Sequence, residues 1–112
     1  MITKYGTEIP DEMLNNYFSS LINQIYKILP IKESGEPTLP QYLNSLVREL
    51  VGANSLFEKT ENDSMLLSII AVIGYLSEND NCDTKIVKSD VFRAINMCKK
   101  LQKKYCTKES SL

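Results

Sequence analysis

Residues 65–76 read MLLSIIAVIGYL, a run of twelve residues without a charged side chain. Apolar residues surround this run on every side of a helix, which is typical of a helix in the centre of a fold. Because a membrane span needs about 20 apolar residues, the run is too short to cross a bilayer. Its β-branched residues leave a buried strand as an alternative, although its length favours a helix. We therefore predict a central helix that begins near Asn62 or Asp63 and ends near Ser77.

An amphipathic pattern precedes this run over residues 11–29, where apolar residues recur at the period of a helix. Pro10 and Asp11 stand at its start, where a missing N–H and a negative charge are both favourable. Pro30 is expected to end this helix and to begin a loop that lasts until Pro37. The opposite face is polar but almost uncharged, and it consists of Asn15, Asn16, Ser19, Ser20, Asn23 and Lys27.

A second helix is predicted over residues 38–51, between the first helix and the central run. Thr38 is its expected N-cap, and Gly52 is its expected C-terminal stop. Residues 53–62 then form a linker, in which the apolar pair Leu56-Phe57 is expected to fold back over the core.

The last helix is predicted over residues 89–105, with Ser89 as its N-cap. Residues 84–87 alternate briefly between polar and apolar side chains before it. They could form a short strand, and residues 2–5 are the expected partner.

These patterns together predict an all-α fold, a compact bundle of about four helices around the hydrophobic third helix. Besides the helices, a minor two-stranded β pairing near the N-terminus is expected. The whole chain, residues 1–112, is expected to form a single helical domain, because its length suits one core. Residues 1–9 are an N-terminal extension of it, and residues 106–112 a frayed tail.

The composition excludes several classes of chemistry. The chain has 112 residues and no histidine, so it holds no Ser-His-Asp or Cys-His nucleophile and no imidazole metal site. Its four glycines are too few for a loop that cradles phosphates. We therefore expect no catalytic residue, no metal and no cofactor, and we interpret the protein as a non-enzyme.

The three cysteines, Cys82, Cys98 and Cys106, are odd in number and lack the spacing of a metal or redox motif. Reduced thiols of this kind are typical of the cytoplasm. The first residues of the chain do not form the apolar run of a secretory signal. A cytoplasmic location is therefore predicted, without a membrane span.

Charge is distributed unevenly along the chain, although the formal net charge is only −1. Acidic residues predominate up to residue 83, and basic residues predominate from residue 84 onward. On a helical wheel, one arc of the last helix lies opposite its apolar stripe and carries most of the positive charge. This basic face consists of Phe92, Arg93, Asn96, Lys99, Lys100, Lys103 and Lys104.

Three interpretations of the basic face are open: a solvated helix surface, a docking surface for a protein, and a contact for nucleic acid. Our first hypothesis is a non-enzymatic protein–protein interaction module, such as an adaptor, inhibitor, immunity factor or subunit of a larger assembly. Its partner is another protein or a second copy of the chain. The uncharged residues Asn15, Asn16, Ser19, Ser20 and Asn23 are a possible second interface, because exposed helix faces normally carry lysine and glutamate. The alternative is a small nucleic-acid-binding or regulatory protein that uses the basic helix, with Phe92 as a stacking platform.

Overall fold

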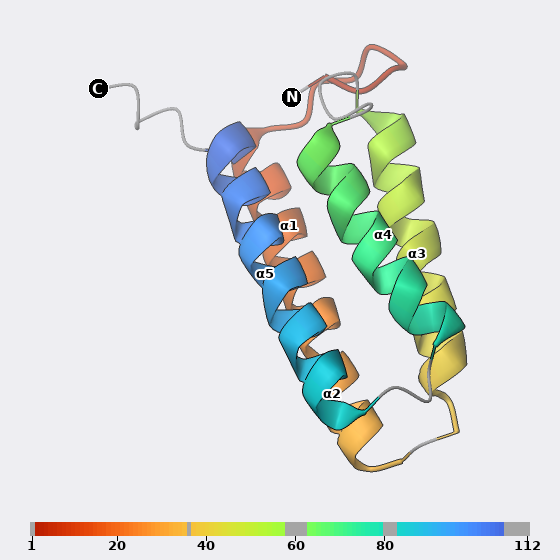
Figure 1. Ribbon diagram of the computed structural model, residues 1–112. Helices are drawn as coiled ribbons and strands as arrows, with labels where there is room; N and C mark the ends of the chain where they lie inside the picture. Colours follow the sequence, from red (N-terminus) through yellow and green to blue (C-terminus); the bar gives the residue numbers. More distant parts are fainter. Residues whose placement is uncertain (1, 36, 58–62, 80–82, 107–112) are drawn as a thin grey trace.

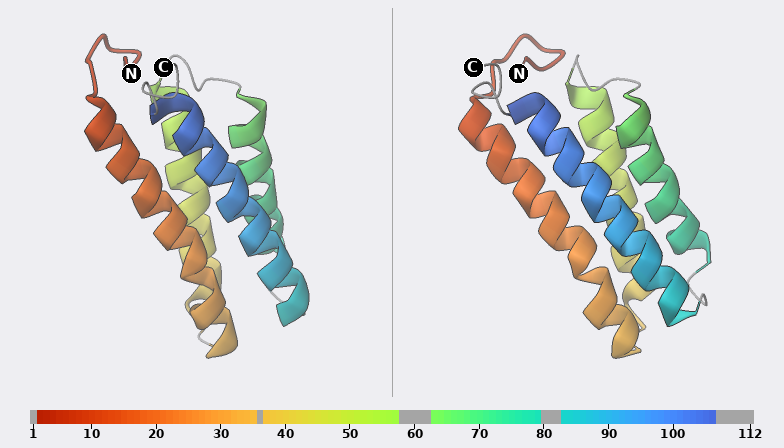
Figure 2. Two further views of the ribbon diagram at one scale, coloured as in Figure 1. Left: turned by 90° about the vertical axis from the view of Figure 1, so that its left-hand side faces the viewer. Right: turned by 60° about the vertical axis from the view of Figure 1, so that its left-hand side comes forward.

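Five helices occupy most of the part of the chain that the computed structural model describes, residues 2–35, 37–57, 63–79 and 83–106. They are α1 (Asp11–Tyr26), α2 (Ile28–Glu33), α3 (Leu39–Leu56), α4 (Ser64–Glu78) and α5 (Thr84–Cys106). The four long helices lie side by side and alternate in direction, and the short α2 continues the lower end of α1 (Figure 1). Helices α1 and α5 pack together on one side, and α3 and α4 on the other (Figure 2). The mostly helical, compact fold agrees with the prediction from the sequence.

The predicted first helix is divided in two at Lys27, and the expectation that Pro30 begins a loop was wrong. If α1 continued without a break, the ring of Pro30 would clash with the carbonyl group of Tyr26. A new helix begins at Ile28 instead, and it places Pro30 in its first turn, where no N–H is needed. The chain then turns near Gly35, whose φ of +67° is in the left-handed region that glycine favours.

Helix α3 runs through Gly52 and ends at Leu56, so Gly52 is not the stop that the sequence predicts. A glycine inside a helix is unfavourable but tolerated, because the other residues of the helix bury a continuous apolar stripe. Thr38 occupies the N-cap position as expected, although its side chain makes no cap hydrogen bond. Phe57 leaves the helix in an extended conformation and is buried over the core, as predicted, whereas Leu56 is exposed.

Helix α5 begins at Thr84, well before the predicted N-cap at Ser89. The carbonyl oxygen of Asp83 accepts a hydrogen bond from the N–H of Val87 at 3.1 Å, which closes the first turn. The predicted pairing of residues 84–87 with residues 2–5 was therefore wrong. Alternation over four residues is a weak signal, and Val87 instead belongs to the buried stripe of the helix.

Residues 2–8 form a turn at one end of the bundle. The hydroxyl oxygen of the buried Thr3 accepts hydrogen bonds from the N–H groups of Tyr5 and Thr7, at 3.3 and 3.1 Å. Thr3 also forms an isolated antiparallel bridge with Phe57, and Lys4 donates its N–H to the carbonyl of Leu56 at 2.8 Å. The N-terminal segment therefore closes the bundle above the end of α3.

The core lies between the four long helices and receives buried residues from each of them. Helix α4 contributes a continuous buried stripe: Leu66, Ile69, Val72, Ile73 and Leu76. It packs against α3 and α5, but its outward side is open, with Leu67 41% and Tyr75 50% exposed. The predicted central position of this helix is therefore not confirmed, because α4 shares the core with the four other helices.

Candidate interaction surfaces

The seven residues of the predicted basic face are all on α5, and six of them follow the helical repeat in two rows. Arg93, Lys100 and Lys104 form one row, which we name the α4-side row. Phe92, Lys99 and Lys103 form the other, which we name the α1-side row, and Asn96 lies beside it. All seven side chains are exposed. The contacts described next show which neighbouring helix each row borders.

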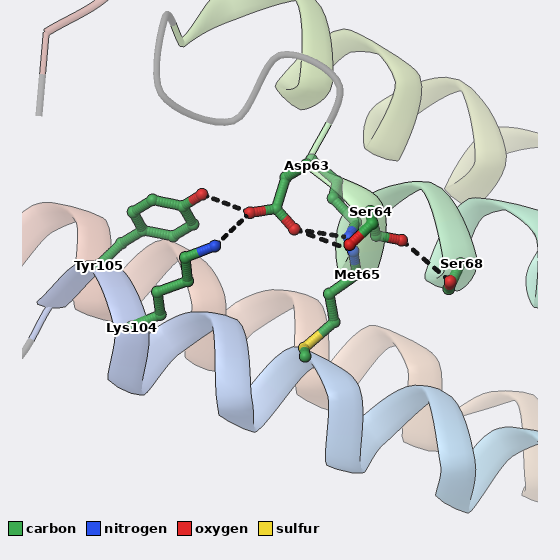
Figure 3. Close-up of polar contacts among 7 residues, drawn as sticks. Asp63, Ser64, Met65, Ser68, Lys104 and Tyr105 are labelled. Carbon is green, nitrogen blue, oxygen red and sulfur yellow. Dashed lines mark hydrogen bonds and ion pairs between the residues drawn. The ribbon is translucent and has the colours of Figure 1, made fainter.

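The α4-side row ends at a cluster that joins α5 to the start of α4 (Figure 3). Asp63 is the N-cap of α4, and its Oδ1 accepts hydrogen bonds from the N–H groups of Met65 and Leu66 at 2.9 and 3.2 Å. Its Oδ2 accepts one hydrogen bond from the ammonium group of Lys104 at 2.8 Å and another from the hydroxyl group of Tyr105 at 2.5 Å. One carboxylate therefore accepts hydrogen bonds from the free N–H groups at the start of α4 and also links α4 to α5.

The environment of Asp63 strongly favours its charged form. Burial raises the pKa of the carboxyl group, but the hydrogen bonds from Lys104, Tyr105, Leu66 and Met65 outweigh burial and lower the pKa to about 2. The ammonium group of Lys104 has a raised pKa because of its hydrogen bond to Asp63. Lys104 is therefore part of the framework of the bundle as well as of the basic face.

The α1-side row begins at an aromatic contact with the lower end of α1. The rings of Phe92 and Tyr26 meet edge to face, with centroids 6.5 Å apart and an interplanar angle of 69°. Both rings remain partly open to solvent, Phe92 by 41% and Tyr26 by 54%. Two exposed rings therefore lie beside the lysines of this row, and Tyr26 is a neighbour that the sequence did not indicate.

The possible second interface on α1 is partly covered by α5. The amide group of Gln102 donates hydrogen bonds at 2.9 Å to the carbonyl oxygen of Asn15 and to the hydroxyl oxygen of Ser19. The side chain of Ser20 accepts a hydrogen bond from Gln24 within α1. Asn16 and Asn23 are exposed. Of these polar side chains, the hydroxyl group of Ser19 therefore joins α1 to α5, whereas Asn15 takes part only through its backbone carbonyl group.

A surface that the sequence did not indicate lies on the outward side of α4. We name it the α4 face: Leu67, Ala71, Gly74 and Tyr75 of α4, together with Val51 of α3. Nothing lies within 4 Å of the position that a Cβ would take at Gly74, and Val51 is 45% exposed. Helix α4 carries no charged residue from Ser64 to Ser77. The exposed Glu78 follows Gly74 by one turn on the same side. The α4 face is therefore a largely apolar strip that ends at one negative charge.

Arg48 borders the α4 face from the side of α3. Ser77 of α4 donates a hydrogen bond to the side chain of Asn44 at 2.5 Å, which shows that this side of α3 adjoins α4. Arg48 and Val51 follow Asn44 by one and two helical turns on the same side of α3, and both are exposed. Basic residues therefore border the α4 face on both sides, Arg48 on α3 and the α4-side row on α5.

Two thiols lie among the described residues, and both are buried and free. Burial raises the pKa of the Cys98 thiol to about 12, so this group is protonated at neutral pH. Cys82 is outside the described residues. Among the residues that the structure describes, no cluster of three or more carboxylates or thiols could hold a metal ion. No helix in that part of the chain has the length and apolar character to cross a membrane.

Comparison with known proteins found no matching family model, no matching curated protein and no matching solved structure. The functional argument below therefore starts from the surfaces of the bundle.

Proposed function

We propose that this protein is a non-enzymatic interaction module that binds an acidic surface of a partner protein through α5. The observation that carries the proposal is the basic face itself. Its seven side chains are exposed along one helix of a protein whose net charge is only −1. Positive charge gathered on one side of a nearly neutral molecule steers acidic partners toward that side.

The internal ion pairs of the bundle support this interpretation. Lys104 is bound to Asp63, and Arg93 forms an ion pair with Asp90 at 3.3 Å within α5. Both pairs leave the basic side chains more than half exposed, at 59% and 63%, so they hold the cations in place without covering them. Buried free thiols also suit a reducing compartment, which supports a cytoplasmic site of action.

A nucleic-acid strand is the second candidate partner, and the contact between Phe92 and Tyr26 favours it. Exposed rings on which bases stack, flanked by cations, are the usual platform for a single strand. The row beside these rings contains lysine and no arginine, and arginine is the better reader of bases. The platform would therefore bind without sequence preference and with a steep dependence on salt.

The test is capture of partners from a lysate of the native host, with and without nuclease, at rising salt concentration. The bait is compared with the variant K99E/K103E, which reverses two charges of the α1-side row. The matched control is K4E/K32E, which also reverses two charges but leaves α5 unchanged. Circular dichroism confirms that each variant is folded.

We expect one protein to be captured by the wild type and by K4E/K32E, with or without nuclease, and to be lost with K99E/K103E. Capture that disappears with nuclease, and at moderate salt, would replace the protein partner with nucleic acid. Equal capture by all three baits would show that the basic face is only a solvated surface.

A further inference from the structure

We infer that the α4 face docks an amphipathic helix of a partner protein, with the apolar side of that helix on α4 and acidic residues along its flanks. This inference rests on the proposed function and adds to it a second surface and the chemistry of what binds there. It combines three observations: the exposed apolar side chains of α4, the open backbone at Gly74, and the basic residues on both borders.

The apolar part of the surface has the length and the residue spacing that an opposing helix requires. Leu67, Ala71 and Tyr75 repeat at helical spacing along about 12 Å of α4, which corresponds to roughly two turns of an opposing helix. Between the two large side chains, Ala71 and Gly74 leave a shallow place where a partner side chain can approach the backbone. Val51 widens the strip on the side of α3. A ridge of apolar residues on the partner would fill this place.

The charged residues on the two sides of the α4 face determine which kind of partner helix fits it. Arg48 stands on one side of the strip, and Arg93 and Lys100 stand on the other. Arg93 is paired with Asp90, so Arg48 and Lys100 are the cations that acidic residues along the sides of a partner helix would meet. A basic helix would meet like charges along both sides, and Glu78 places one negative charge only at the lower end of the strip. A second copy of the α4 face is a poorer match for the same reason, because it would present its own cations to these cations.

The experiment uses a designed peptide of about 18 residues that has a leucine stripe flanked by glutamates. A peptide of this length is partly helical in solution. A second peptide has lysine in place of every glutamate, and a third has the same composition with the stripe scrambled. Binding is measured by fluorescence anisotropy, and the site is located from amide chemical shifts of the labelled protein. The test variant is A71E, which puts a carboxylate in the middle of the strip.

The control variant is N16E, at an exposed position on α1, which packs against α5 rather than α4. We expect the glutamate peptide to bind at least about tenfold more tightly than either of the other peptides. We also expect A71E to weaken its binding by about tenfold or more, because a carboxylate would be buried without a partner. N16E should bind as the wild type does, and the shifts should be largest at Leu67, Ala71 and Gly74.

Equal binding of the glutamate and lysine peptides would overturn the inference, and so would shifts that map to other helices. A concentration-dependent dimer that is abolished by A71E would overturn it in favour of a second copy. The capture experiment separates this inference from the proposed function. A partner that is lost with K99E/K103E, but captured equally by A71E and the wild type, would leave the function standing and refute docking on α4.

Discussion

The carboxylate of Asp63 is expected to stabilise the bundle through its charge, and the substitution Asp63→Asn measures how much. Asparagine is also a good N-cap, so the variant keeps the hydrogen bonds at the start of α4. It loses the negative charge and the second oxygen, which accepts from Lys104 and Tyr105. The pKa of Asp63 is about 2 in the folded protein and has an ordinary value of 3.8. At about 1.36 kcal/mol for each pKa unit, this difference corresponds to about 2.4 kcal/mol.

Solvent reaches the outer part of this cluster, since the side chain of Lys104 is 59% exposed, and screening therefore reduces the expected effect to about 1–2 kcal/mol. The pKa is lowered on folding, so the stabilisation is complete above about pH 5 and is lost as the pH falls toward about 2. The free energy of unfolding of the wild type and of Asp63→Asn should therefore differ most at neutral pH and converge in acid.

Urea unfolding followed by circular dichroism between about pH 2 and pH 7 measures this difference. The substitution Lys104→Met supplies the control, because Asp63→Asn should cost less in its presence if the two charges act together. Equal stability of the wild type and Asp63→Asn at neutral pH would refute the reasoning, and so would a difference that does not change with pH.

Three further predictions test the packing of the bundle. The substitution Leu66→Ala should lower the free energy of unfolding by about 2–5 kcal/mol, whereas Leu67→Ala should change it by less than about 1 kcal/mol, because only Leu66 is buried. Comparable losses in urea unfolding would contradict the one-sided position of α4. The substitution Tyr42→Phe should cost about 1 kcal/mol in the same assay, since it removes the hydrogen bond from the hydroxyl group to the carbonyl oxygen of Gln24, and an unchanged stability would exclude that contact. The thiol of Cys98 should resist alkylation near neutral pH until the protein unfolds, and mass spectrometry that finds it labelled in the native state would contradict its burial.

Helix boundaries were predictable where the capping residue acts locally. Asp63 follows polar residues and precedes a long apolar run, so the start of α4 was predicted correctly. Pro30 and Gly52 were misinterpreted because their effect depends on context. Proline is tolerated in the first turn of a new helix, and a glycine can lie inside a helix that tertiary packing stabilises.

The candidate surfaces were predictable only in part, for a different reason. Periodicity shows which side chains of a helix are apolar but not how many neighbours the helix has. The sequence therefore predicted α4 as a buried central helix, and the α4 face was missed. The exposed residues of α5 were predicted because they lie opposite a clear apolar stripe. The contacts of Lys104 and Gln102 join residues more than 40 positions apart, which no local pattern reports.

The central claim, that α5 binds protein, is tested most directly by light scattering coupled to size exclusion at low salt, after the protein is mixed with the partner that it captures. The absorbances of protein and of nucleic acid are followed separately across the peak, for the wild type and for K99E/K103E. We predict a complex with the summed mass of both proteins and without nucleic acid for the wild type, and the separate masses for K99E/K103E. Nucleic acid that elutes with the wild type, leaves at high salt and is absent from K99E/K103E would contradict the claim and assign the basic face to a nucleic-acid strand.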